Sequence, residues 1–142
     1  MTATINTDAA QSGWFKIDIA GNATAVANTL GSVLNPEGVL LQILDAYLYT
    51  TIASAGASQL DIGINATAGS DDTDMCAALA INAAAPNVKR ICGGNVASES
   101  ALTGAQNGVL WAATEYMCFY NPAAVASTAF RASLFVEYLR LA

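Results

Sequence analysis

Apolar and polar residues alternate with a period of two along much of this chain, a pattern typical of half-buried β-strands. In the first such segment, Phe15, Ile17 and Ile19 share one face, whereas Lys16 and Asp18 share the other. The same alternation is found in the segments 60–65, 109–120 and 130–139. Turn sequences rich in Gly, Asn, Ser and Pro separate these segments. The pattern therefore predicts an all-β fold, an antiparallel β-sandwich or a barrel.

The alternation also assigns faces to individual residues. In the segment 60–65, the apolar even-numbered residues are predicted to point inward, with Asp61 and Asn65 pointing outward. The segment 109–120 is predicted to be one strand, with Trp111, Met117 and Phe119 on one face.

The longest apolar run, 39–52, places apolar side chains on both faces. Read with a period of two, Leu44 and Leu48 lie on one face and Leu41, Ile43 and Tyr47 on the other. A strand that is apolar on both faces is either enclosed between two layers or exposed to a partner.

An acidic residue, Asp45, interrupts that apolar run. An unpaired charge is costly in such a setting. We therefore expect Asp45 to face an edge, a bulge or water, and we hypothesise an ion pair with Arg131 or Arg140.

Two segments lack a decisive pattern. Residues 1–13 are small, polar and unpatterned, so they are predicted to be a flexible N-terminal arm ahead of a single β-sandwich domain at 14–142. Residues 75–81 fit either a strand or a short helix, because Asp74 could cap a helix whereas Pro86 and the short length favour a strand.

The chain is acidic and carries few charges. Only 11% of its residues are charged, against about 25% in an ordinary domain, and the net charge is -6 with no histidine. The lack of histidine excludes a Ser-His-Asp triad, a Cys-His pair and an HExxH zinc site. Five cationic residues are too few to neutralise many phosphates, and a net negative surface is repelled by acidic membranes, so we expect neither nucleic-acid nor membrane binding.

No residues form a recognisable catalytic, cofactor or metal site. Asp71, Asp72 and Asp74 lack the spacing of a calcium loop and are interpreted as a solvated turn. Trp14 and Trp111 could stack on sugars, but a single tryptophan in a strand is more often a core or rim residue. We therefore expect no enzymatic activity and no cofactor.

The three cysteines, Cys76, Cys92 and Cys118, fit neither a disulfide framework nor a metal motif. They are interpreted as reduced, buried thiols. The first residues lack the pattern of a signal peptide, and no apolar run reaches the length of a membrane span. These features predict synthesis in a reducing cytoplasm.

Several stretches resemble the head decoration, or cement, proteins of tailed bacteriophages. The resemblance rests on the turn Asn35–Gly38, on the strand sequences 43–51 and 55–64 that follow it, and on the ending 134–141. It covers residues 35–142 and includes no catalytic signature. It implies a jelly-roll-like sandwich that lies on the outside of a capsid, in virions assembled in the cytoplasm of a bacterial host.

The resemblance also implies a structural role with two kinds of partner. Such a protein would form a homotrimer and bridge subunits of the major capsid protein, which stabilises the shell. The expected subunit-interface residues are Tyr47, Tyr49, Phe135 and Tyr138, since exposed aromatic residues commonly stabilise interfaces. The expected capsid-contact residues lie in the N-terminal arm: Thr2, Thr4, Ile5, Asn6 and Thr7. The alternative is a β-sandwich carbohydrate- or receptor-binding module on the virion.

Overall fold

The structure is a computed structural model that describes residues 12–23, 26–92 and 109–141. These residues form strands joined by turns, and they include no helix long and apolar enough to cross a membrane. The strands are β1 (Ser12–Ala20), β2 (Asn28–Leu34), β3 (Leu41–Ile52), β4 (Gln59–Asn65), β5 (Cys76–Ala80), β6 (Asn87–Cys92), β7 (Val109–Trp111), β8 (Tyr116–Asn121) and β9 (Arg131–Arg140).

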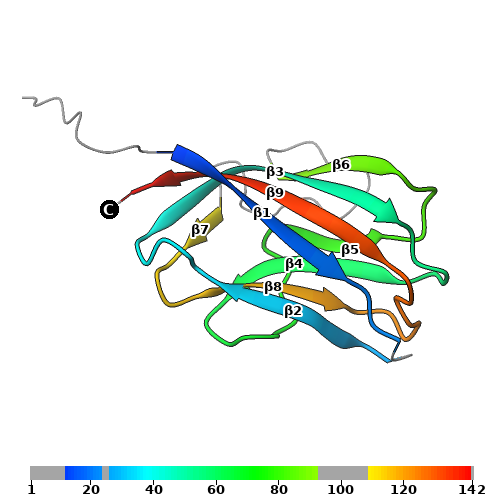
Figure 1. Ribbon diagram of the computed structural model, residues 1–142. Helices are drawn as coiled ribbons and strands as arrows, with labels where there is room; N and C mark the ends of the chain where they lie inside the picture. The colour runs from blue at the N-terminus through cyan, green and yellow to red at the C-terminus, as the bar shows by residue number, and fades with distance from the viewer. Residues whose placement is uncertain (1–11, 24–25, 93–108, 142) are drawn as a thin grey trace, which may run out of the picture.

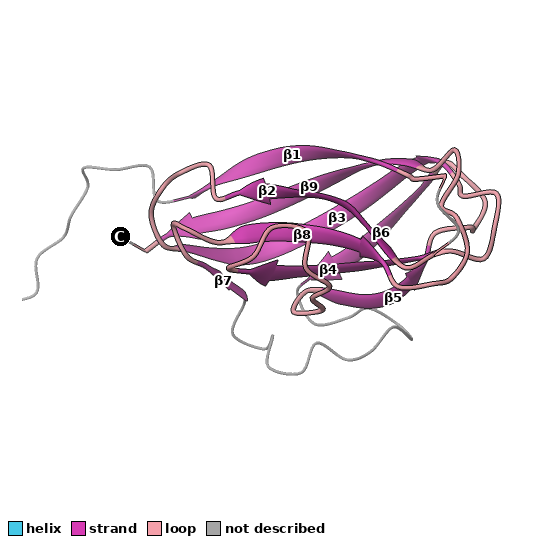
Figure 2. Ribbon diagram, turned by 90° about the horizontal axis from the view of Figure 1, so that it is seen from below, coloured by secondary structure: helices cyan, strands magenta, loops and turns pink. Residues whose placement is uncertain are grey.

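The strands form two antiparallel sheets that pack face to face (Figures 1 and 2). One sheet has the order β1-β9-β3-β6, and the other has the order β2-β8-β4-β5. β7 also pairs with β3, opposite residues 41–43, whereas β6 pairs opposite residues 46–50. Because β9 occupies the other side of β3, β6 and β7 are two parts of one edge strand.

With β6 and β7 counted together, the sandwich has eight strands, four in each sheet. The chain passes between the sheets at almost every connection, and only β4 and β5 follow one another within one sheet. This is the strand order of a jelly roll, in which two Greek keys are wound together. The prediction of an all-β, jelly-roll-like sandwich is confirmed.

The core lies between the sheets, where the inward positions of the alternating pattern meet. Ile17 and Ile19 of β1 are buried, as are the even-numbered residues of β9 from Ala132 to Tyr138. From the opposite sheet, Leu60 and Ile62 of β4 are fully buried. The alternation predicted these inward faces correctly.

The run 39–52 carries apolar side chains on both faces, as predicted, but a bulge in β3 changes which residues lie on each face. Along β9, Ile43 pairs with Tyr138 and Asp45 with Glu137, which leaves Leu44 as an extra residue. A bulge of one residue reverses the alternation beyond it. Odd-numbered residues before the bulge and even-numbered residues beyond it therefore point into the same core, and Leu44 is exposed.

The single strand predicted for 109–120 is also wrong, because the chain changes sheet within it. β7 ends at Trp111 and β8 begins at Tyr116 in the other sheet. Glu115 forms the corner: its carboxylate accepts the Ala112 N–H at 2.9 Å, and its carbonyl accepts the Trp111 indole N–H at 2.8 Å. Trp111, Met117 and Phe119 still share the core, but from facing sheets.

Residues 75–81, which the sequence left open, contain strand β5. β1 begins at Ser12, so Ser12 and Gly13 belong to the sheet rather than to the predicted arm. They pair with Leu139 and Tyr138 of β9. The expected capsid-contact residues of the arm lie outside the described residues. The start of β1 and the end of β9 lie at the same end of the sandwich (Figure 1).

Candidate functional site

The outer face of the β1-β9-β3-β6 sheet carries large apolar side chains that no described part of the chain covers completely. We call it the aromatic face; its members are Trp14, Tyr47, Tyr49, Val88 and Phe135. Trp14 is 54% exposed and Val88 is 62% exposed. Apolar side chains gathered over four neighbouring strands are typical of an interaction surface.

Strand register brings these residues together. Phe135 of β9 pairs directly with Tyr47 of β3, and Tyr49 pairs with Val88 of β6. Trp14 reaches over β9 and stacks on Tyr47, with ring centroids 6.3 Å apart and planes inclined by 28°. The surface is thus continuous from the β1 edge to the β6 edge.

An ion pair fixes the orientation of Tyr47. The Asp45 carboxylate accepts the Arg90 Nε–H at 2.9 and 3.0 Å, and Arg90 Nη2 lies 2.8 Å from Asp45 Oδ2. The Tyr47 hydroxyl donates to the same Oδ2 at 3.0 Å, and the Ala46 N–H donates to Oδ1 at 2.8 Å. The hypothesised partner of Asp45, Arg131 or Arg140, is wrong, because the bulge turns Asp45 toward β6 and Arg90.

The ion pair also determines the charge state of Asp45. Burial raises the pKa of Asp45, but the hydrogen bonds from Arg90 and Tyr47 outweigh burial, and the pKa lies below its ordinary value. On β1, the Asp18 carboxylate accepts the Ser133 hydroxyl and lies 2.9 Å from Lys16 Nζ, which together lower its pKa. Asp45 and Asp18 on this outer face are therefore each paired with a cationic side chain.

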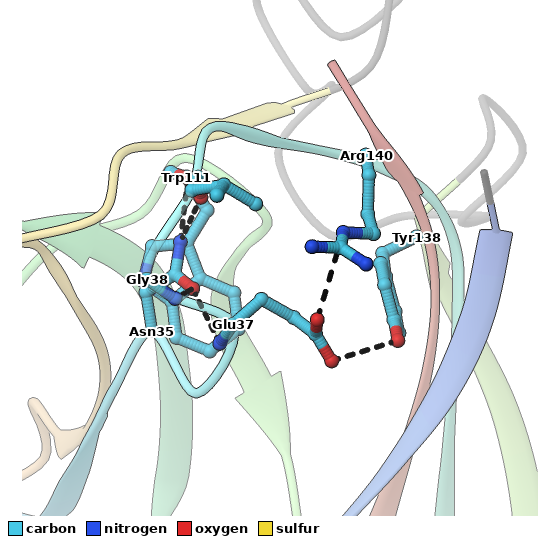
Figure 3. A network of polar contacts seen from close by, with 7 residues as sticks. Asn35, Glu37, Gly38, Trp111, Tyr138 and Arg140 are labelled. Atoms are coloured by element: carbon cyan, nitrogen blue, oxygen red, sulfur yellow. Dashed lines mark hydrogen bonds and ion pairs between the residues drawn. The ribbon is translucent and has the colours of Figure 1, made fainter. Parts of the chain in front are cut away.

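Tyr138, predicted to be an interface residue, belongs to the core instead. Its ring is 8% exposed and stacks on Phe15 with centroids 4.2 Å apart. Its hydroxyl donates to Glu37 Oε1 at 3.1 Å, and Arg140 Nε lies 3.6 Å from Glu37 Oε2 (Figure 3). Gly13, opposite Tyr138, leaves room for this ring, since a Cβ there would lie 2.5 Å from the hydroxyl oxygen.

The turn that carries Glu37 is held by Asn35. The side-chain Oδ1 of Asn35 accepts the N–H groups of Glu37 and Gly38, and its Nδ2 donates to the Trp111 carbonyl at 2.9 Å (Figure 3). Gly38 has a φ of 65°, which favours glycine. The predicted turn at 35–38 is thereby fixed to β7 and β9 of the β1-β9-β3-β6 sheet.

The opposite sheet has a different outer face, which is covered by residues 66–75, the connection between β4 and β5 (green in Figure 1). We call this connection the strap. Gly63 of β4 lies under Asp72, and a Cβ at Gly63 would lie 2.6 Å from the Asp72 backbone. The predicted solvated turn is thus exposed at Asp71 and Asp74, but it also packs on the sheet.

The strap buries outward-facing residues of β4 that the alternation left exposed. Asp61 is 4% exposed and accepts the Ala78 N–H. Burial and Asp71 raise the pKa of Asp61 to about 6. Within the described ranges, no three His, Cys, Asp or Glu side chains are placed to hold a metal ion.

Sequence reasoning missed Val88 and Arg90 as members of the site, and it considered Trp14 only as a sugar-stacking, core or rim residue. Trp14 occupies an outward position of the predicted strand, so the alternation itself could have identified it. Val88 and Arg90 required the pairing of β6 with β3, which connects residues about forty positions apart in the chain. The sequence contains no signal for that pairing.

No protein-family model matches this chain, and no curated protein matches its sequence. A solved chain described as "Capsid of Ralstonia phage GP4" is similar in structure, with a TM-score of 0.60 and 16% sequence identity. The match covers 100% of this chain and 92% of that chain. At this identity the likeness shows a shared fold.

Proposed function

We propose that this protein is a structural component of a bacteriophage virion that binds the outside of the capsid and stabilises the shell by bridging major capsid subunits. The observation that carries the proposal is the structural match along the entire chain to a chain of a phage capsid. A match of this extent spans both sheets of the jelly roll, rather than one shared sheet. The role is non-enzymatic and requires no cofactor.

The aromatic face supports a role in assembly. The outward positions of its sheet carry three cationic and three acidic residues: Lys16, Arg90, Arg131, Asp18, Asp45 and Glu137. The whole chain has a net charge of -6. A surface on which the charges balance therefore repels another acidic protein less than a net negative surface does. We assign it to protein–protein contact.

Assembly into a homotrimer through Tyr47, Tyr49 and Phe135 is part of the proposal. A threefold interface joins two different patches of the same chain, so the aromatic face would meet another surface of the neighbouring copy and not itself. Tyr138 is excluded from this contact because it is buried in the core. Light scattering of the purified protein measures the state directly, and a monomer at all concentrations would contradict this part.

The N-terminal arm, with Thr2, Thr4, Ile5, Asn6 and Thr7, is proposed to contact a capsid subunit. Deletion of residues 2–11 leaves β1 complete, since the strand begins at Ser12. We expect the shortened chain to fold normally and to lose binding to shells that lack the protein. Normal binding by the shortened chain would contradict a role for the arm.

The test of the proposed function is addition of the purified chain to phage shells that lack it. We expect saturation at a fixed number of copies per shell and a higher temperature of shell disruption. A bovine serum albumin control shows whether crowding alone has this effect. Absence of saturable binding would contradict the proposal.

A carbohydrate-binding module on the virion is the second candidate, favoured by the exposed Trp14 ring beside Tyr47. Trp111 cannot contribute, because it is fully buried. Titration with bacterial surface glycans would then quench the Trp14 fluorescence, and the Trp14→Phe variant would show no quenching. Saturable glycan binding without shell binding would favour this candidate over the first.

A further inference from the structure

The two sheets are bordered by four strand edges, and three of these edges are short or interrupted. β2 has a bulge between Thr29 and Gly31, where Gly31 has a φ of 128°. β5 has five residues, and one of them, Ala78, has a φ of 51°. A third edge is divided between β6 and β7, which pair with different parts of β3. Short and bulged edges of this kind discourage pairing with another chain.

β1 forms the fourth edge, and it is neither short nor bulged (Figure 2). Its nine residues, from Ser12 to Ala20, pair with β9 without any shift in register. In the part of the chain that the structure describes, β9 is its sole strand neighbour. Alternate residues of an edge strand direct their N–H and C=O groups away from that neighbour. One side of β1 therefore presents a regular row of backbone groups to which another strand can bind.

The side chains of β1 are suited to a second copy of the same strand. The inward residues Phe15, Ile17 and Ile19 are apolar. The outward residues Lys16 and Asp18 have opposite charges, and their side chains are 55% and 71% exposed. Both charged groups are thus accessible to a strand placed beside β1.

One antiparallel register satisfies both faces of the strand at once. If Ile17 lies opposite the partner's Ile17, then Lys16 lies opposite the partner's Asp18, and Asp18 lies opposite the partner's Lys16. On the inward side, Phe15 lies opposite the partner's Ile19, so apolar residues meet apolar residues. A register centred on Lys16 or on Asp18 would place two like charges directly opposite one another, which is destabilising.

We propose that β1 is an interaction surface for a second copy of this chain: two copies join edge to edge through β1, in the register centred on Ile17, and form one continuous sheet. A twofold contact must be self-complementary, and opposite charges at positions 16 and 18 meet this requirement. The contact uses the edge of the sheet and leaves its outer face open. It is therefore separate from the proposed trimer contact and does not depend on the proposed function.

Charge reversal tests this register. Asp18→Lys gives β1 two cationic residues, and Lys16→Asp gives it two acidic residues, so two cross-strand pairs change from opposite to like charge in either variant. We expect each variant alone to self-associate at least about tenfold more weakly than the wild type, measured by light scattering over a dilution series. An equimolar mixture of the two variants should recover the association, and so should the double variant Lys16→Asp Asp18→Lys.

Asp71→Lys is the matched control, because it changes the net charge as Asp18→Lys does, but at an exposed position of the strap on the other sheet. It should associate as the wild type does. Urea unfolding verifies that each variant is folded, since Asp18 also accepts the Ser133 hydroxyl. A wild type that associates no more strongly than Asp18→Lys, or a mixture that fails to recover association, would overturn the proposal.

Cross-linking of the wild-type protein tests the same contact without any substitution. A carbodiimide joins a lysine amine to a neighbouring carboxylate, and an equimolar mixture of unlabelled and isotope-labelled copies separates the two possible products by mass. The pair of Lys16 and Asp18 within one chain, 2.9 Å apart, gives products of a single isotope composition. We expect an additional product of mixed composition that joins Lys16 to the partner's Asp18, and its absence would contradict the pairing of β1 edges.

Discussion

The two sheets of this sandwich follow the same alternating pattern but differ in what becomes of their outward residues. On the β2-β8-β4-β5 sheet, the strap covers polar and small residues, and Asp61 is 4% exposed. On the β1-β9-β3-β6 sheet, outward residues are aromatic and open, and Trp14 is 54% exposed. The chain thus packs its own strap on one outer face and leaves the aromatic face open, which is the arrangement expected when the aromatic face has a partner.

The electrostatics of the two faces differ in the same way. Asp18 and Asp45, on the outer face of the β1-β9-β3-β6 sheet, have cationic and hydroxyl partners, and their pKa values are lowered. Acidic residues around the strap lack cationic partners within the described ranges, and the pKa values of Asp61 and Asp74 are raised, chiefly by burial. The two faces should therefore respond to pH in opposite directions.

The largest expected effect separates a core tyrosine from a surface one. Tyr138→Ala should lower the free energy of unfolding by about 3–5 kcal/mol, because it removes a buried ring stacked on Phe15. Tyr49→Ala, on the aromatic face, should cost less than about 1 kcal/mol. Urea unfolding measures both, and equal losses would place Tyr49 in the core or Tyr138 on the surface.

A second prediction concerns pH. Asp61 has a raised pKa, so its contribution is fully present below the unfolded value of 3.8 and is lost as pH rises through about 6, roughly 3 kcal/mol in total. Asp45 has a lowered pKa, so its contribution is present above 3.8 and is lost as pH falls. Because the Asp61 contribution declines between about pH 4 and 6, we expect the free energy of unfolding to be greatest near pH 4.

The matched variant is Asp61→Asn. It should remove most of the decline in the free energy of unfolding between pH 5 and pH 8, and it should leave the loss of stability at acidic pH unchanged. Urea unfolding at several pH values provides the measurement. An unchanged decline in this variant would show that the strap does not cause it.

A third prediction tests how closely the strap packs. Gly63→Val should lower the free energy of unfolding by about 2 kcal/mol, because its side chain would displace Asp72. Ala20→Val adds bulk to an exposed position of β1 on the opposite sheet and should change stability by less than about 0.5 kcal/mol. Thermal unfolding of both variants measures the two changes. An unchanged stability of Gly63→Val would contradict the close packing of the strap on the β2-β8-β4-β5 sheet.

The smallest effect distinguishes two ion pairs on the aromatic face. Arg90→Ala leaves the Asp45 carboxylate, whose side chain is 11% exposed, without its partner and should cost about 1 kcal/mol after allowance for the half-exposed arginine. Lys16→Ala breaks an exposed pair with Asp18 and should have almost no effect. Equal costs in urea unfolding would mean that Asp45 is as well solvated as Asp18.

The sequence was sufficient for the class of fold and for most inward positions, because burial of one strand face imposes a period of two. It was insufficient where a single residue changes that period, as Leu44 does in β3, or where the chain turns between sheets, as at Glu115. Pairings such as Arg90 with Asp45 depend on contacts between distant segments. Burial of Asp61 depends on a loop that crosses the sheet, which local pattern does not reveal.

The most direct test of the account compares shell binding by the wild type with that of the double variant Trp14→Ala Tyr49→Ala. Both substitutions lie on the aromatic face at exposed positions, so the variant should fold with nearly wild-type stability. We predict that the wild type binds purified phage shells saturably and that the folded variant loses at least about tenfold in affinity, as expected for the loss of aromatic interface residues. Equal binding by the two proteins would contradict the assignment of the aromatic face to virion assembly.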